Sequence, residues 1–141
     1  MKHRTLALAV FLSAAGCGGG PNGPSSVAQI GGSWAGHLQS TNWPAAPIVV
    51  TLTQTDSSVT GTWTSASFDW NGTFNGAVTK TTFSGTATLS GPTESGVGRC
   101  TGNATFSGPA STGAPTLVLT SAGFTSACGN PPTGLTWNLQ R

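Results

Sequence analysis

Charged side chains are scarce in this chain of 141 residues, since only 6% of its residues are Asp, Glu, Lys or Arg. Two of the basic residues lie at the extreme N-terminus, and beyond residue 16 the formal charges cancel. The residues that cancel are Lys80, Arg99 and Arg141 against Asp56, Asp69 and Glu94. Nucleic-acid binding relies on clustered Lys and Arg that neutralise phosphates. The sequence therefore argues against a nucleic-acid partner.

Groups that catalyse reactions or bind metal ions are equally few. Tyrosine is absent, and His37 is the only histidine beyond residue 16. His37 falls on the polar side of an alternating segment, which is typical of a solvated side chain. Asp69 and Glu94 are expected at the same end of the fold, as a glycosidase pair would be, but their spacing does not distinguish them from solvated loop acids. With no nucleophile elbow, phosphate-binding loop or metal-ligand set, we expect no enzyme activity, no cofactor and no metal site.

Long hydrophobic runs are also missing. The apolar run at residues 6–15 is shorter than the roughly 20 residues of a membrane-spanning helix, and it follows a basic head at residues 2–4. Residues 1–16 are therefore typical of an export signal. Residues 14–17, Ala-Ala-Gly-Cys, resemble the lipobox of bacterial lipoproteins, which implies cleavage after Gly16 and acylation of Cys17. The alternative is an ordinary secretory signal with an incidental cysteine.

The lipobox resemblance implies a lipid-anchored protein of the bacterial cell envelope, with the membrane as its partner through Cys17. Buried acyl carbons contribute about 0.8 kcal/mol each, so several chains would anchor the protein durably. The next residue is Gly18 rather than the aspartate that marks inner-membrane retention in enteric bacteria, which favours the outer membrane. Residues 17–29, rich in Gly, Pro, Asn and Ser, predict a flexible tether.

Cysteine is rare as well, with three residues in the chain. If Cys17 is acylated, Cys100 and Cys128 remain as a pair in an oxidising compartment, where only one connectivity is possible. We expect them at the same end of the fold. A disulfide between them would stabilise the protein by about 3 to 4 kcal/mol in the chain-entropy model.

Residues 30–141 alternate between apolar and polar side chains, which predicts strands. In residues 70–78, WNGTFNGAV, one face carries Trp70, Gly72, Phe74, Gly76 and Val78. Eight such segments follow one another, with connections that are short at one end and mostly longer at the other. We predict an all-β domain, an eight-stranded antiparallel up-and-down β-barrel, because closure removes exposed strand edges. An open β-sandwich is the alternative.

Two terminal features of this domain resemble the calycins, the group of lipocalins and their relatives with avidin-like barrels nearby. Gly32, Ser33 and Trp34 match the Gly-x-Trp signature of the first strand, and Arg141 matches the basic residue that ends the last strand. Trp34 and Arg141 share inward parity at the tightly connected end of the barrel. We therefore expect the Arg141 guanidinium within about 6 Å of the Trp34 ring, closing that end by a cation–π contact.

Four aromatic residues are candidates for binding a ligand at the opposite end, the mouth: Trp43, Phe68, Trp70 and Phe124. Aromatic residues in loops are less readily explained by core packing, although they could also plug the barrel. The interior aromatics could enclose a cavity or fill the barrel, since eight strands leave just enough room for side chains.

Two functions therefore stay open. The first is a calycin-like module that binds a small apolar ligand or a peptide at the mouth. The second is a non-enzymatic structural or interaction lipoprotein with a solid barrel, including a module that resembles bacterial barrel-type protease inhibitors.

Overall fold

A computed structural model of the chain describes residues 26–93, 95–126 and 129–141. The strands follow one another in the order β1 (Gly32–Gln39), β2 (Ala46–Thr55), β3 (Ser58–Ser65), β4 (Trp70–Thr79), β5 (Thr82–Pro92), β6 (Arg99–Pro109), β7 (Thr116–Gly123), β8 (Thr125–Ser126) and β9 (Thr133–Gln140). A single 3-10 turn, η1 (Ala66–Phe68), separates β3 from β4. The predicted signal at residues 1–16, Cys17 and residues 18–25 of the predicted tether lie outside the described residues.

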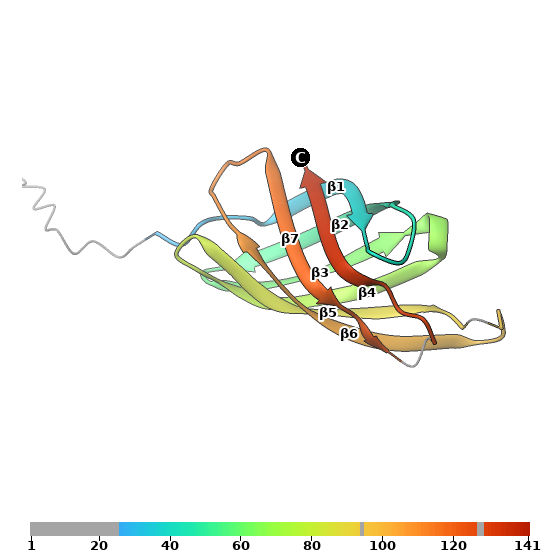
Figure 1. The fold of residues 1–141 in the computed structure, drawn as a ribbon. Coiled ribbons are helices and arrows are strands. Elements are labelled where there is room, and N and C mark those ends of the chain that lie inside the picture. The colour runs from blue at the N-terminus through green and yellow to red at the C-terminus, as the bar shows by residue number, and fades with distance from the viewer. Residues whose placement is uncertain (1–25, 94, 127–128) are drawn as a thin grey trace, which may run out of the picture.

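The strands close into an antiparallel up-and-down barrel, as predicted, and do not form an open sandwich (Figure 1). Neighbouring strands follow the order β5-β4-β3-β2-β1-β9-β7-β6, and β6 pairs with β5 to complete the ring. Two small elements add to the predicted eight-stranded barrel. The two-residue strand β8 also pairs with β6, because the chain between β7 and β9 runs back along that strand, and η1 adds one 3-10 turn.

The two neighbours of β6 pair with it very differently. Its pairing with β5 runs the full length of the strand, from Arg99 to Pro109. Among the described residues, its ladder with β7 consists of the pair Ser107 and Thr120. We call this sparse junction the β6–β7 seam.

The burial pattern confirms the predicted alternation. In β4, Trp70, Phe74 and Val78 are buried, whereas Asn71 and Thr73 are exposed. The same parity recurs along the other barrel strands, and it gathers the apolar side chains into one core inside the barrel. The sequence period of two therefore determined which face of each strand points inward.

The middle of the barrel is filled by aromatic rings. Trp137 on β9 is completely buried, and its ring centroid lies 4.9 Å from that of Trp63, 5.1 Å from that of Phe74 and 4.8 Å from that of Phe106. These four rings form a packed layer across the interior. At this level, side chains fill the barrel.

Glycine at position 72 provides the space that one of these rings needs. Gly72 pairs with Trp63 across β3 and β4, and a Cβ atom added at Gly72 would meet both the Trp63 Nε1 atom and the Thr88 carbonyl oxygen. The Trp63 indole uses this space to donate a 2.8 Å hydrogen bond to Thr88 O on β5. The glycine in β4 therefore lets the Trp63 indole reach across that strand from β3 to β5.

The predicted contact between Arg141 and Trp34 is present at the tightly connected end of the barrel. The Arg141 guanidinium carbon lies 4.2 Å from the Trp34 ring centroid, and Arg141 Nη2 donates to Gly31 O at 3.0 Å. Trp34 itself is buried and donates from Nε1 to Ile30 O at 2.9 Å. Arg141 is exposed, so it covers the indole from outside.

The described residues contain no helix that is long and apolar enough to cross a membrane.

Candidate functional site

The end of the barrel opposite Arg141 carries an open cleft of about 260 Å³, which we call the mouth cleft. All four connections at this end contribute to it. Its lining residues are Trp43, Phe68, Trp70, Leu89, Pro92, Thr93, Asn130, Pro131 and Pro132. None of them carries a formal charge.

Three of the four predicted aromatic candidates come together as one wall of the cleft. The ring centroids of Trp43 and Phe68 lie 5.4 Å apart, those of Trp43 and Trp70 5.1 Å, and those of Phe68 and Trp70 4.6 Å. Trp70 is buried, while Trp43 and Phe68 are half-buried and keep ring surface open to the cleft. Contacts of this kind stabilise by about 0.5 to 1.5 kcal/mol per pair beyond the area that they bury.

The fourth candidate, Phe124, belongs to the core and does not line the cleft. It is 4% exposed, and its ring lies 6.0 Å from Trp63 and 6.1 Å from Phe106. The expectation that Phe124 forms the rim is therefore corrected. Gly123, with a φ of 134°, allows the chain to turn after β7, and the Phe124 amide then donates to Pro132 O at 3.1 Å. This turn directs the side chain inward.

Asn42 fastens the loop between β1 and β2 to the loop that precedes β9. Its Nδ2 donates to Asn130 Oδ1 and to Pro131 O, both at 3.0 Å. Its Oδ1 accepts from the Thr133 amide at 2.9 Å and from the Thr133 hydroxyl at 3.1 Å. Trp43 Nε1 adds a 2.9 Å bond to Asn130 O. These contacts hold the Trp43 wall and the proline wall together, and no sequence pattern marks Asn42 for this role.

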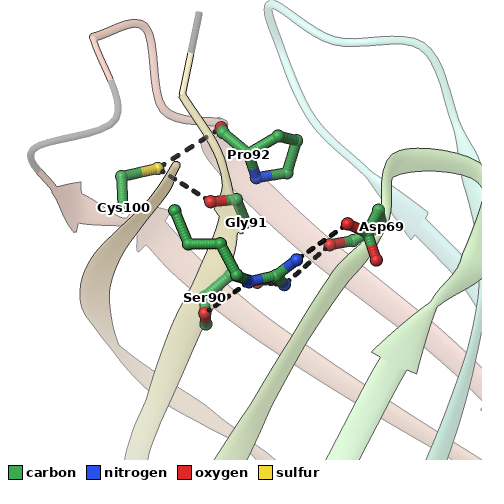
Figure 2. Close-up of polar contacts among 6 residues, drawn as sticks. Asp69, Ser90, Gly91, Pro92 and Cys100 are labelled. Carbon is green, nitrogen blue, oxygen red and sulfur yellow. Dashed lines mark hydrogen bonds and ion pairs between the residues drawn. The ribbon is translucent and has the colours of Figure 1, made fainter. Parts of the chain in front are cut away.

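Arg99 fastens the other side of the mouth (Figure 2). Its Nη1 lies 2.7 Å from Asp69 Oδ2, and Nη2 donates to Asp69 O and Ser90 O, both at 3.0 Å. Nε donates to Ser90 Oγ at 3.1 Å. The ion pair is exposed, so its charges add about 0 to 1 kcal/mol. The main effect of the Arg99 contacts is to join the connection before β4 to β5 and β6. Sequence reasoning considered Asp69 with Glu94, but Glu94 lies outside the described residues and Asp69 binds Arg99.

Cys100 lies close to the cleft residue Pro92. It is 6% exposed, and its sulfur lies 3.4 Å from the carbonyl oxygens of Gly91 and Pro92 (Figure 2). Cys128 lies outside the described residues. The disulfide between Cys100 and Cys128 therefore stays a prediction.

The titratable residues that the structure describes form no cluster suited to binding a metal ion. His37 lies on β1, with the outward parity that the sequence indicated. Among residues 26–93, 95–126 and 129–141, no three His, Cys, Asp or Glu side chains group closely enough to hold a metal ion. The predicted aromatic residues Trp43, Phe68 and Trp70 meet at the mouth cleft, which is the candidate site.

Comparisons of the chain with protein-family models, with curated proteins and with solved structures returned no match. The lipoprotein and calycin resemblances accordingly depend on the residues that carry them. The geometry of the mouth cleft is the observation that bears on function.

Proposed function

We propose that this protein is a lipoprotein of the cell envelope, tethered through Cys17, whose calycin-like barrel binds a small apolar ligand or a peptide at its mouth. The mouth cleft, with its wall of three aromatic rings, is the observation that supports this function. Pockets that enclose a whole drug-sized ligand measure about 300 to 1,000 Å³. A cleft of about 260 Å³ lies just below this range and is suited to a small apolar group.

The hydrogen bonds of Asn42 and those of Arg99, which we call the two polar fastenings, support a binding role. They order the cleft before anything binds. Asn42 fixes the wall that carries Trp43, and Arg99 fixes the strands that carry Trp70 and Pro92. Binding to ordered walls avoids the entropic cost of immobilising loops and side chains. Such walls favour a specific ligand over loose hydrophobic contact.

The N-terminal segment lies at the end away from the cleft (Figure 1). The Ala28 amide donates to Lys80 O in the turn between β4 and β5, and the Gln29 amide donates to Thr112 Oγ1 in the connection between β6 and β7. Both connections are at the tightly connected end. An anchor at Cys17 would therefore leave the cleft facing away from the membrane and open to ligands.

The test of this function is native mass spectrometry of the full protein purified from its source without denaturation. We expect a bound small molecule or peptide to remain with the protein and to be lost in Trp43→Ala. The matched control is Thr53→Ala on the exposed outer face of β2, which should retain the ligand. Equal retention by both variants would contradict binding at the mouth cleft.

The tether gives its own prediction. Replacing Cys17 with Ser removes the thiol that would be acylated, so the protein should move from the membrane fraction to the soluble fraction or keep its signal uncleaved. Fractionation, together with the mass of the N-terminal peptide, measures this. Unchanged membrane association with no lipid mass on that peptide would contradict the anchor.

The filled aromatic layer around Trp137 favours the second candidate function, a structural or interaction lipoprotein with a solid barrel that resembles protease inhibitors. In that case the native protein would carry no small molecule. Its partner would instead be recovered as a protein complex that Trp43→Ala does not disrupt.

A further inference from the structure

Some polar groups around the mouth cleft already have hydrogen-bond partners within the protein, and others do not. On the loop before β9, the Asn130 carbonyl oxygen accepts from Trp43 Nε1, the Pro131 carbonyl from Asn42, and the Pro132 carbonyl from the Phe124 amide. The two prolines have no amide hydrogen to offer. The backbone carbonyls of this wall are thus engaged within the protein.

The Asn130 side chain is oriented by a chain of contacts that starts at a backbone amide. The Thr133 amide can only donate, so the Asn42 atom that it contacts is Oδ1. Asn42 Nδ2 therefore donates to Asn130, and the Asn130 atom that accepts is Oδ1. Asn130 is exposed, and its Nδ2 makes no hydrogen bond to any described residue. It presents a donor at the cleft.

Trp70 presents a second donor on the facing wall. Its Nε1 makes no hydrogen bond to any described residue, and it is not among the fully buried polar atoms that lack a partner. The Thr93 hydroxyl donates to Val97 O at 2.7 Å, so its proton is already engaged. Among the described lining residues, the side-chain donors left for a ligand are the Trp70 indole and the Asn130 amide.

We propose that the mouth cleft binds a proline-rich segment of a partner protein. This inference rests on the proposed function and selects its peptide alternative. A cleft with aromatic faces, two donors and no charged lining residue complements a ligand with an apolar ring and a hydrogen-bond acceptor. An Xaa-Pro unit has this combination, because its tertiary amide has a carbonyl acceptor and no N–H.

Backbone shape supports the same choice. Proline-rich segments adopt the extended polyproline II helix, which has no internal hydrogen bonds and leaves its carbonyls available. Such segments bind to grooves lined by aromatic side chains and lose little entropy on binding. The cleft holds one proline ring beside Trp43, Phe68 and Trp70, and the neighbouring carbonyls of the segment accept from Trp70 and Asn130. A segment without proline has the same carbonyl acceptors, but it lacks the apolar rings and the preformed extended backbone.

The experiment is a titration of the full-length protein with a hexaproline peptide, acetylated at its N-terminus and amidated at its C-terminus, followed by NMR of the indole N–H resonances. We expect the Trp70 resonance to shift and the Trp34 resonance, at the opposite end, to stay unchanged. Hexa-alanine with the same two caps is the peptide control, and we expect it to bind at least tenfold more weakly. Equal affinity for the two peptides would overturn the proposal.

Variants separate the donors from the rings. Trp70→Phe keeps an aromatic ring but removes the indole donor, and it should weaken hexaproline binding about fivefold, the effect of one neutral hydrogen bond. Asn130→Asp keeps an acceptor for Asn42 but replaces the donor with a negative charge, so it should weaken binding by at least tenfold. Thr53→Ala should bind like the parent protein. Unchanged affinity in both cleft variants would overturn the proposal.

A small apolar probe distinguishes failure of this inference from failure of the proposed function. If 1-naphthol shifts the Trp70 resonance and hexaproline at millimolar concentration does not, the proline-rich partner is wrong and the apolar-ligand function stands. If neither probe shifts any mouth resonance, both proposals are overturned.

Discussion

Replacing Trp137 with Ala is expected to lower the free energy of unfolding by about 4 kcal/mol, within the range of Trp-to-Ala changes in packed cores. Trp137 is fully buried and contacts the rings of Trp63, Phe74 and Phe106. Those rings belong to strands that cannot close the space without distorting the barrel, because hydrogen-bonded neighbours fix the position of each strand. Urea or guanidinium denaturation of the full protein, monitored by near-ultraviolet circular dichroism, measures the loss.

A second variant at this position isolates the cause. The Trp137 Nε1 atom is buried and has no hydrogen-bond partner among the described residues. Trp137→Phe therefore keeps most of the ring contacts and removes an unsatisfied donor, so it should cost less than half as much as Trp137→Ala. Asn138→Ala, on the other face of the same strand, is the control. Equal losses for the Phe and Ala variants would contradict packing as the cause.

Adding one methyl group at Gly72 should have an effect of similar size, about 3 kcal/mol. The new Cβ would collide with the Thr88 carbonyl oxygen and with Trp63 Nε1, so the hydrogen bond between these two groups could not form. Overpacking costs about 1 to 3 kcal/mol, and a lost hydrogen bond adds about 1 kcal/mol. The same denaturation experiment on Gly72→Ala measures the combined loss.

Asn75→Ala is the matched control for the Gly72 variant. Asn75 lies on the same strand, is exposed, and should change the free energy of unfolding by less than about 0.5 kcal/mol. If Gly72→Ala lowered the free energy of unfolding as little as Asn75→Ala, the Trp63 indole would have room to move. The claim that Trp63 requires glycine at position 72 would then be wrong.

The barrel could be predicted from sequence because its information is local. Each strand repeats with a period of two, and this period alone assigns residues such as Leu38, Phe74 and Leu119 to the interior. The contact between Trp34 and Arg141 could be predicted because it needed only parity and the closure of β1 against β9. Neither inference required knowledge of a loop conformation.

The site could be predicted only in part because loops depend on contacts between distant segments. Trp43, Phe68 and Trp70 were found from their aromatic character at one end of the barrel. Phe124 has the same character and is also expected at that end, but the turn after β7 places it in the core. No period or motif reports such a turn.

The two polar fastenings were missed for the same reason. Asn42 meets its partners about 90 positions along the chain, and Arg99 meets Asp69 30 positions away. The residue types alone, an asparagine and an arginine in or beside polar connections, are typical of solvated loops. Their roles emerge only when the barrel brings the connections to one end.

The β6–β7 seam should make the barrel easier to widen at one strand pair than at the others. A ring of strands resists widening because each hydrogen-bonded ladder acts as a stiff joint, and the ladder between β7 and β9 runs from Thr116 to Gly123. Between β6 and β7 the described ladder is the single pair Ser107 and Thr120, whose hydroxyl donates to Ser107 O. Further along β6, the two pairs with β8 hold the chain on the same side. Transient opening of the barrel should therefore begin where β7 lies beside β6, while the other strand pairs keep their register.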